Sequence, residues 1–265
     1  MTSACKKAII VAAGRGRRLG GDTEEIPKCM VRVGDRPILH WQLDALAASG
    51  IDDIVIVRGY LGRRIDAGTR KVRFVDNPEW ERNNILASLL CAQDDFAGGF
   101  YFSYCDIVYT AAGVAKLAAA IRDPAAAALV VDRRWTEAYQ GRDLHPVSEA
   151  ELTLVEVGTS RVLQVGKRAV DAAQAAGEFI GLAHFSAQGA ASLTRIWEAA
   201  SAGAGLDAPF GRAQMLRQAY LTDALNAMAD AGERLIPVFI DGEWREIDTQ
   251  QDLAVAQRTV AGWTT

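Results

Sequence analysis

The segment from Lys7 to Lys28, KAIIVAAGRGRRLGGDTEEIPK, constrains the fold more than any other part of the chain. Its apolar run, Ala8 to Ala13, is too short for an independent helix and contains β-branched residues, which predicts a buried strand. Gly14 and Gly16 follow at once and let a ligand approach the backbone closely, because glycine has no Cβ. Four cations then suit a polyanion such as a nucleoside triphosphate, namely Arg15, Arg17, Arg18 and Lys28. The segment predicts a phosphate-binding loop after a strand.

Two other glycine-loop motifs do not fit this segment. The dinucleotide fingerprint G-x-G-x-x-G would require a glycine at position 19, which is Leu19. The P-loop pattern G-x-x-x-x-G-K-[ST] is also absent. On the loop alone, an ordinary tight turn between a strand and a helix explains the glycines as well as a ligand does.

Strand and helix patterns alternate along the first half of the chain. We expect further strands at 53–58, 72–75, 100–105 and 127–131, and helices at 38–50, 85–92 and 111–122. Such alternation predicts a Rossmann-like α/β fold, with a mostly parallel sheet and helices on both faces. Ligands of these sheets bind beyond the carboxyl ends of the strands, where Gly14 to Arg18, Gly59 and Asp106 would lie.

The second half of the chain has a different composition and a different pattern of expected elements. Residues 133–146 are polar and aromatic, and 152–157 with 162–165 predict a hairpin that faces the substrate. A strand at 179–185, a helix at 187–200, a mobile loop at 201–209, a helix at 221–231, a strand at 235–240 and a helix at 249–260 should follow. We expect one domain, with a nucleotide-binding core at about 1–132 and an acceptor-binding part at about 133–265.

Composition excludes several classes of protein. A formal net charge of −4 and a pI near 5.5 argue against a general nucleic-acid binder. The four cysteines have no C-x-x-C spacing, so we expect reduced, mostly buried thiols without zinc. No long apolar run suggests a membrane span or a leader, which predicts a soluble cytoplasmic protein. The sequence leaves the oligomeric state open, with a homodimer as one option.

Three groups of residues resemble one enzyme family. Ala12 to Leu19, Pro27-Lys28 and Val31 to Leu39 carry the order A-A-G-x-G-x-R-L, P-K and V-x-V-G-D-R-P-I-L, which resembles the nucleotidyltransferases that make NDP-sugars and CDP-alcohols. Asn83-Asn84 with Ser88-Leu89, Phe100 to Asp106, and Glu246 to Asp248 with Asp252-Leu253 look like its phosphocholine and phosphonate cytidylyltransferase branch. The similarity spans nearly the whole chain and implies a GT-A-like nucleotidyltransferase fold with a small β insertion on the acceptor side.

The resemblance implies roles for individual residues. Arg18 would bind the β- and γ-phosphates, Lys28 would bridge the α-phosphate and the acceptor, and both would oppose transition-state charge. The nucleotide would lie against a set of small and polar residues, Ala12, Ala13, Gly14, Gly16, Gly59, Asn84 and Ser88. Helix capping by Asn84 with a satisfied Ser88 is an equally good reading of those two residues.

Asp106 and Asp248 are the candidate ligands of Mg²⁺, the expected cofactor. Asp106 follows an apolar strand at the ligand edge of the sheet, and Mg²⁺ prefers a few hard oxygen ligands with phosphate and water. Asp248 precedes a helix, so N-capping is its strong alternative, and only the resemblance favours metal there.

The acceptor residues are the least determined. Trp135 lies near where the phosphocholine branch places an aromatic against a quaternary ammonium, although a single tryptophan is more often a packing residue. Glu178 and Asp223 could bind an amine or hydroxyl, and each could equally be a helix cap or a surface acid. The positive charge nearby and the segments 145–151 and 177–181 look more like the enzymes of phosphonate biosynthesis. This suggests CTP and a small phosphonate, with a carboxylate or hydroxyl, as partners, and a phosphoalcohol such as phosphocholine as the other option. The alternatives are a sugar-1-phosphate nucleotidyltransferase and a non-catalytic nucleotide-binding regulator.

Overall fold

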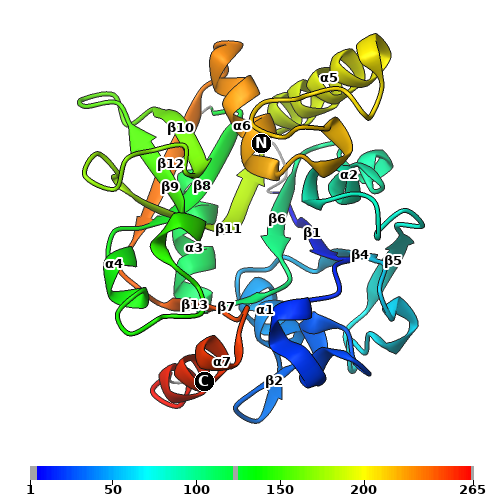
Figure 1. Cartoon of the computed structure of the whole chain (residues 1–265), viewed down its shortest axis with the longest axis vertical. Helices are drawn as coiled ribbons and strands as arrows, with labels where there is room; N and C mark the ends of the chain where they lie inside the picture. Colours follow the sequence, from blue (N-terminus) through cyan, green and yellow to red (C-terminus); the bar gives the residue numbers. More distant parts are fainter. Residues whose placement is uncertain (1–4, 122–124, 264–265) are drawn as a thin grey trace.

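A computed structural model describes residues 5–121 and 125–263 of the chain. Its main sheet has nine strands, β1 (Lys7–Ala12), β4 (Asp53–Arg58), β5 (Val72–Asp76), β6 (Phe100–Tyr104), β8 (Ala127–Asp132), β9 (Glu151–Val155), β10 (Val162–Lys167), β11 (Gly177–Phe185) and β12 (Leu235–Ile240). Along the sheet the order is β10-β9-β11-β6-β1-β4-β5, and β8 and β12 extend from β11 (Figure 1).

The sheet is parallel in one half and mixed in the other. β5, β4, β1 and β6 are parallel neighbours, whereas β11 is antiparallel to β6, β8 and β9. The predicted hairpin forms as β9 and β10, but β9 pairs with β11 and so widens the main sheet. The structure confirms the predicted α/β fold with a mostly parallel sheet, and it shows that the second half of the chain completes that sheet.

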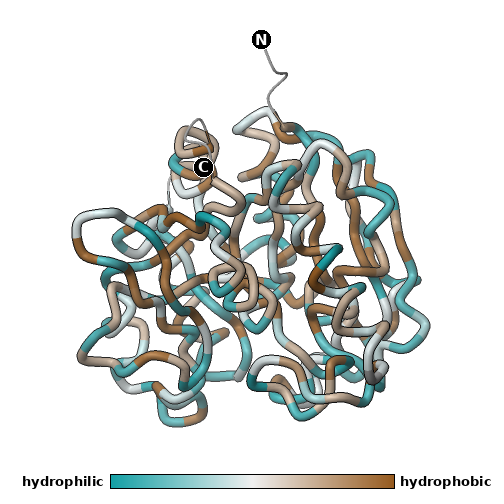
Figure 2. The backbone as a smooth tube through the Cα atoms, turned by 90° about the horizontal axis from the view of Figure 1, so that it is seen from above, coloured by the Kyte–Doolittle hydropathy of each residue, from teal (hydrophilic) through white to brown (hydrophobic). Residues whose placement is uncertain are grey.

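Helices cover both faces of the sheet. The helices are α1 (Ile38–Ala48), α2 (Ile85–Leu90), α3 (Ala111–Ala120), α4 (Trp135–Ala138), α5 (Ala187–Ala204), α6 (Leu221–Asp230) and α7 (Gln250–Val260). Ile9 and Val11 of β1 pack with α2, α5 and α6, while Ala8 and Ile10 pack with α1 and α3. This alternation follows from the two-residue period of a strand. In Figure 2 much of the hydrophilic, teal part of the tube lies toward the outside of the molecule.

Two predicted boundaries need comment. The segment predicted as a loop from Ser201 begins as helix, because α5 runs on to Ala204 before Gly205 takes a positive φ of 78°. The small, alanine-rich composition that suggested a loop is equally compatible with helix. The predicted end of the third helix at Arg122 lies outside the described residues.

Short strands connect distant parts of the chain. β2 (Arg32–Val33) pairs with β3 (Arg36–Pro37), and β7 (Ile107–Tyr109) pairs antiparallel with β13 (Trp244–Glu246). The β7–β13 ribbon brings the start of α7 to the carboxyl end of β6 (Figure 1). Among the described residues, no helix combines the length and apolarity that crossing a bilayer would need.

Candidate active site

A cavity of about 370 Å³ opens at the carboxyl ends of β1 and β6. Its wall includes Ala13, Gly14 and Gly16 after β1, and Asp106 in the turn between β6 and β7. Arg18 lies in the 3-10 segment η1 (Arg17–Thr23), which follows the loop directly and is kinked at Gly20. The glycine loop therefore lies at the sheet edge where the sequence predicts it.

Lys28 is the central cation of the cavity. It begins the 3-10 helix η2 (Lys28–Met30), is 7% exposed, and its Nζ lies 2.6 Å from Oδ2 of Asp106 and also contacts Oδ1 of Asp248. Burial alone would lower the pKa of the ammonium, but the two carboxylates outweigh it and raise that pKa above its usual value. Gly16 has a φ of 67°, and a Cβ there would lie 3.0 Å from the Lys28 side chain. The glycine thus lets the loop pack directly on the lysine.

Asp248 forms ion pairs with more than one cationic side chain. Besides Lys28, Nη2 of Arg18 lies 2.6 Å from its Oδ2, and Arg18 itself is half exposed at the cavity rim. Burial tends to raise the pKa of Asp248, but Lys28, His145 and Arg18 hold that pKa well below its usual range. The backbone N–H of Ile247 donates to the Asp106 carbonyl at 2.8 Å, which fixes the two acidic residues side by side. Asp248 does not cap α7, because Thr249 does.

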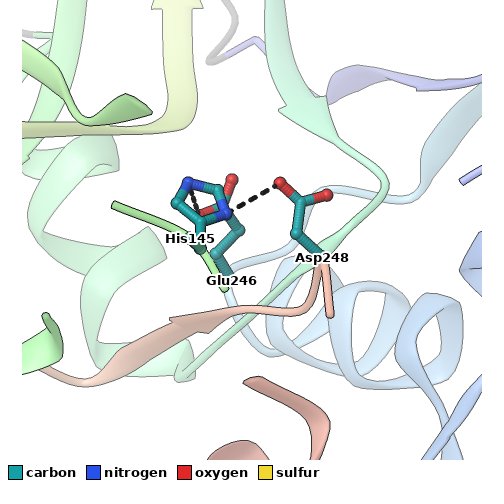
Figure 3. Close-up of side chains that lie close together, drawn as sticks. All are labelled: His145, Glu246 and Asp248. Carbon is teal, nitrogen blue, oxygen red and sulfur yellow. Dashed lines mark ion pairs between the residues drawn. The ribbon is translucent and has the colours of Figure 1, made fainter. Parts of the chain in front are cut away.

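A buried polar network supports Asp248 from below. Figure 3 shows His145 between Glu246 and Asp248, with ring nitrogens 3.5 Å and 3.3 Å from their carboxylates. Arg142 lies 2.9 Å from Glu246 and 2.5 Å from Asp252, which also completes the capping box of α7. Sequence reasoning did not identify Arg142, His145 and Glu246 as site residues. The signals available were the segment Glu246 to Asp248 and residues 145–151, both noted for their resemblance but given no role for Glu246 or His145.

The expected nucleotide residues divide into two groups. Ala13, Gly14, Gly16, Asn84 and Ser88 line the cavity, whereas Ala12 is buried in the core. Gly59 lies behind the cavity wall, since a Cβ there would be 2.6 Å from Trp80 and 2.8 Å from the Ala13 carbonyl. The structure brings the first group together around the cavity and places Ala12 and Gly59 behind its wall.

Asn84 and Ser88 already have partners within the protein. Asn84 caps α2 by accepting from the Ile85 N–H at 2.8 Å, and its amide donates to the Gln218 carbonyl. The Ser88 hydroxyl accepts from Asn77 at 2.9 Å and donates to the Asn84 carbonyl. Both residues therefore shape the wall of the cavity.

The three predicted acceptor residues lie in different parts of the structure. Glu178 lines the cavity, but Trp135 is 6% exposed within an apolar cluster with Tyr139, Ala150 and Leu152 and does not line it. Asp223 completes the capping box of α6 and accepts from the N–H groups of Arg212 and Tyr220. It borders a second cavity of about 600 Å³, which adjoins the first at Lys167 and Tyr220. Trp135 is thus a packing residue and Asp223 a helix cap.

The donor set at Asp106 and Asp248 fits a magnesium ion. Both carboxylates contact one ammonium, so their oxygens already converge, and carboxylate oxygen is the ligand type that Mg²⁺ prefers. Ligand atoms of His145, Glu246 and Asp248 also lie within 4.8 Å of one another. Arg142, Arg18 and Lys28 contact the carboxylates of that second set, so its charges are balanced without a metal.

The carboxyl edge of this sheet carries a glycine loop, a buried lysine and two converging carboxylates. This arrangement is typical of α/β proteins that bind nucleotides and transfer phosphorus-containing groups. Residues 8–246 match the model of the MobA-like NTP transferase domain, and the chain belongs to this nucleotidyltransferase family. The family confirms the resemblance drawn from the glycine loop and Lys28.

Relatives of known activity match the chain over different lengths. The CTP:phosphoglutamine cytidylyltransferase of Campylobacter jejuni is 30% identical over 94% of this chain and 98% of the relative. The choline-phosphate cytidylyltransferase of Streptococcus pneumoniae is 38% identical over 36% of this chain and 42% of the relative. Among solved structures, the inositol-1-phosphate CTP transferase of T. maritima has a TM-score of 0.75 and 21% identity, with complete coverage of both chains. That likeness supports the fold.

Proposed function

We propose that this chain is a cytidylyltransferase that transfers CMP from CTP to a small phosphonate or phosphorylated acceptor. An acceptor oxygen attacks the α-phosphorus in line, the bond from that phosphorus to the bridging oxygen breaks, and pyrophosphate leaves. The observation that carries the proposal is the contact of buried Lys28 with both Asp106 and Asp248 beside the loop from Gly14 to Arg18.

The chain's own residues would supply positioning and charge. The backbone at Ala13 and Gly14 would face the nucleotide, because Asn84 and Ser88 already have protein partners. Arg18, half exposed beside Asp248, would bind the β- and γ-phosphates and the leaving pyrophosphate. Lys28 would contact the α-phosphate, where negative charge spreads in the transition state.

Asp106 and Asp248 would hold Mg²⁺. Bound there, the ion would supply neutralisation of phosphate charge, which nucleotidyl transfer generally needs. The lysine between the carboxylates keeps them together before nucleotide binds, since neither charge is left uncompensated.

CTP is the proposed donor because the C. jejuni relative, which matches almost the whole chain and almost its own full length, is named for that nucleotide. A second candidate, a sugar-1-phosphate nucleotidyltransferase, is favoured by the UTP–glucose-1-phosphate uridylyltransferase of Bacillus subtilis. That enzyme is 38% identical, but over 29% of this chain and 25% of its own length. The longer match favours cytidylyl transfer.

Pyrophosphate release tests the proposal. The purified chain with Mg²⁺ should release pyrophosphate with CTP and an acceptor from the panel of 2-aminoethylphosphonate, 2-hydroxyethylphosphonate, phosphocholine, phosphoglutamine and glucose 1-phosphate. UTP, dTTP and GTP serve as the competing donors. Turnover only with glucose 1-phosphate and another donor would establish the second candidate. Tight CTP binding without pyrophosphate release from any acceptor would indicate a non-catalytic regulator.

Lys28→Ala provides the matched negative variant. We expect it to lower kcat by about 10²–10³-fold while the protein stays folded, because one transition-state donor is lost. Lys116→Ala is the control, since Lys116 forms an exposed ion pair with Glu243 away from the cavity. Full activity of Lys28→Ala would refute the proposed role.

A further inference from the structure

One wall of the candidate active site is strongly acidic. It consists of four glutamates, Glu149, Glu151, Glu178 and Glu246, and we call it the acidic wall. Glu178 and Glu151 lie on β11 and β9, which are on the opposite side of β6 from β1 and its phosphate-binding loop. The wall is therefore placed where the part of the acceptor remote from the reacting phosphate would lie.

The cations near this wall do not neutralise it fully. Lys167 lies 3.1 Å from Glu149, and Arg142 lies 2.9 Å from Glu246. Arg133 and Arg134, which the sequence placed near the acceptor, form exposed ion pairs with Asp241 and Glu137 and do not line the cavity. Of the cations that the sequence placed near the acceptor, Lys167 lines the cavity and pairs with Glu149, and Arg142, outside the lining, pairs with Glu246. Glu151 and Glu178 have no cationic partner among the described ion pairs.

Glu178 carries an unused hydrogen-bond acceptor. The residue is 4% exposed, and its Oε1 accepts a 2.6 Å hydrogen bond from the Tyr139 hydroxyl. Its Oε2 is buried and has no hydrogen-bond partner among the described residues. A buried carboxylate oxygen without a donor is costly, so this atom is suited to a ligand that brings an N–H group.

Resting on the proposed function, we infer that the acceptor carries a protonated primary or secondary amine, and that Glu178 is the residue that selects it. An ammonium supplies both the positive charge that the acidic wall lacks and the N–H that Oε2 of Glu178 lacks. A trimethylammonium group supplies the charge without a donor, and a hydroxyl supplies a donor without the charge. The sequence left an amine, a hydroxyl or a carboxylate open for the acceptor, and of these we infer the amine.

Without a ligand, burial favours the protonated form of two glutamates of the wall, and a bound cation would oppose that effect. Burial raises the pKa of Glu178 to about 8 and that of Glu151 to about 7. Glu246 and Glu151 repel charge on Glu178, while Tyr139 and Arg142 stabilise it. An ammonium bound here would favour the ionised carboxylate, as any close opposite charge does.

Matched acceptors test the inference on the unaltered protein. We would compare 2-aminoethyl-, 2-hydroxyethyl- and 2-(trimethylammonio)ethylphosphonate, and the amine and hydroxyl pair of propylphosphonate, with CTP. The amines should have kcat/KM values about tenfold or more above their partners, since a charged hydrogen bond to a buried group is at stake. Equal or better turnover of the hydroxyl or trimethylammonium compounds, or of glucose 1-phosphate alone, would overturn the inference and leave nucleotidyl transfer intact. No turnover with any acceptor and CTP would instead count against the proposed function.

Glu178→Gln separates selection from general damage. It should raise KM for the amine about tenfold while KM for CTP and turnover of the hydroxyl compound stay nearly constant. Glu137→Gln, an exposed change outside the cavity, is the control. Equal losses with every acceptor would contradict a selecting role, and the comparison of acceptors on the unaltered protein decides the matter if this variant does not fold.

Discussion

Nζ of Lys28 lies 2.6 Å from Oδ2 of Asp106, and the same ammonium contacts Asp248, which is 220 positions away in sequence. One buried cation thus holds together two carboxylates that would otherwise repel each other. We expect Lys28 and a divalent cation to compete for the same two carboxylates, because both are positively charged and the carboxylate oxygens would hold either.

Asp106→Asn should test that competition. The amide keeps the shape and removes one charge, so we expect the Mg²⁺ concentration for half-maximal activity to rise about tenfold or more. Activity should also disappear when EDTA is added and return with excess Mg²⁺. Asp241→Asn, in an exposed ion pair, is the control. An unchanged Mg²⁺ dependence in Asp106→Asn would exclude this carboxylate as a ligand.

Arg142→Met should destabilise the protein. Arg142 is 7% exposed at its side chain and contacts the carboxylates of Glu246 and Asp252, which the change would leave without their cation. Loss of one partner from such a buried network costs about 3–5 kcal/mol in unfolding free energy. Urea denaturation measures this, with Arg133→Met as the exposed counterpart that should behave like the unaltered protein. Equal midpoints for the two variants would show that the network contributes nothing.

The pKa of Glu178 makes stability depend on pH. Burial raises this pKa to about 8, whereas an unfolded glutamate titrates near 4.3, so the folded state binds the extra proton between those values. The unfolding free energy should therefore fall as pH rises from about 4.3 to about 8. Glu178→Gln removes this loss and should be more stable than the unaltered protein at pH 8.5, on the order of 1–3 kcal/mol, and similar at pH 5. Thermal melting without ligands measures both, and an identical difference at the two pH values would contradict the assignment.

Gly59→Ala should damage the nucleotide side of the cavity indirectly. The added Cβ would lie 2.6 Å from Trp80 and 2.8 Å from the Ala13 carbonyl, so Ala13 or Trp80 must move. We expect KM for CTP to rise several-fold with little change for the acceptor. Gly113→Ala on α3 is the control, because a Cβ added there meets open space. Gly98→Ala would be unsuitable, because Gly98 has a φ of 83° that strains any other residue. Normal CTP kinetics in Gly59→Ala would mean that the wall adapts.

The placement of several candidate site residues could be predicted from local sequence. The strand from Lys7, the glycine loop and Asp106 needed only a short apolar run and the rule that ligands bind at carboxyl ends of strands, whereas Lys28 was selected through the family resemblance. Helix capping was equally local, and Asn84 was identified as a possible cap of the helix that it begins.

Long-range pairing explains what was missed. The antiparallel β11 and the widening of the sheet by β9 depend on partners far away in sequence, which strand patterns alone do not specify. Trp135 was placed near the acceptor by its position in the chain, but its ring packs against Tyr139 in an apolar cluster. Glu178 was named as an acceptor candidate from the sequence, but its hydrogen bond from the hydroxyl of Tyr139 was not, because no spacing rule connects two residues on separate elements.

The β7–β13 ribbon sets the order in which this protein can become functional. As the ribosome releases the chain, the glycine loop and Lys28 emerge early, whereas β13 and Asp248 emerge more than 200 residues later. A chain terminated before β13 would carry Lys28 with one of its two carboxylates and no support from α7. The candidate site should thus remain incomplete until β13 has been made and has paired with β7.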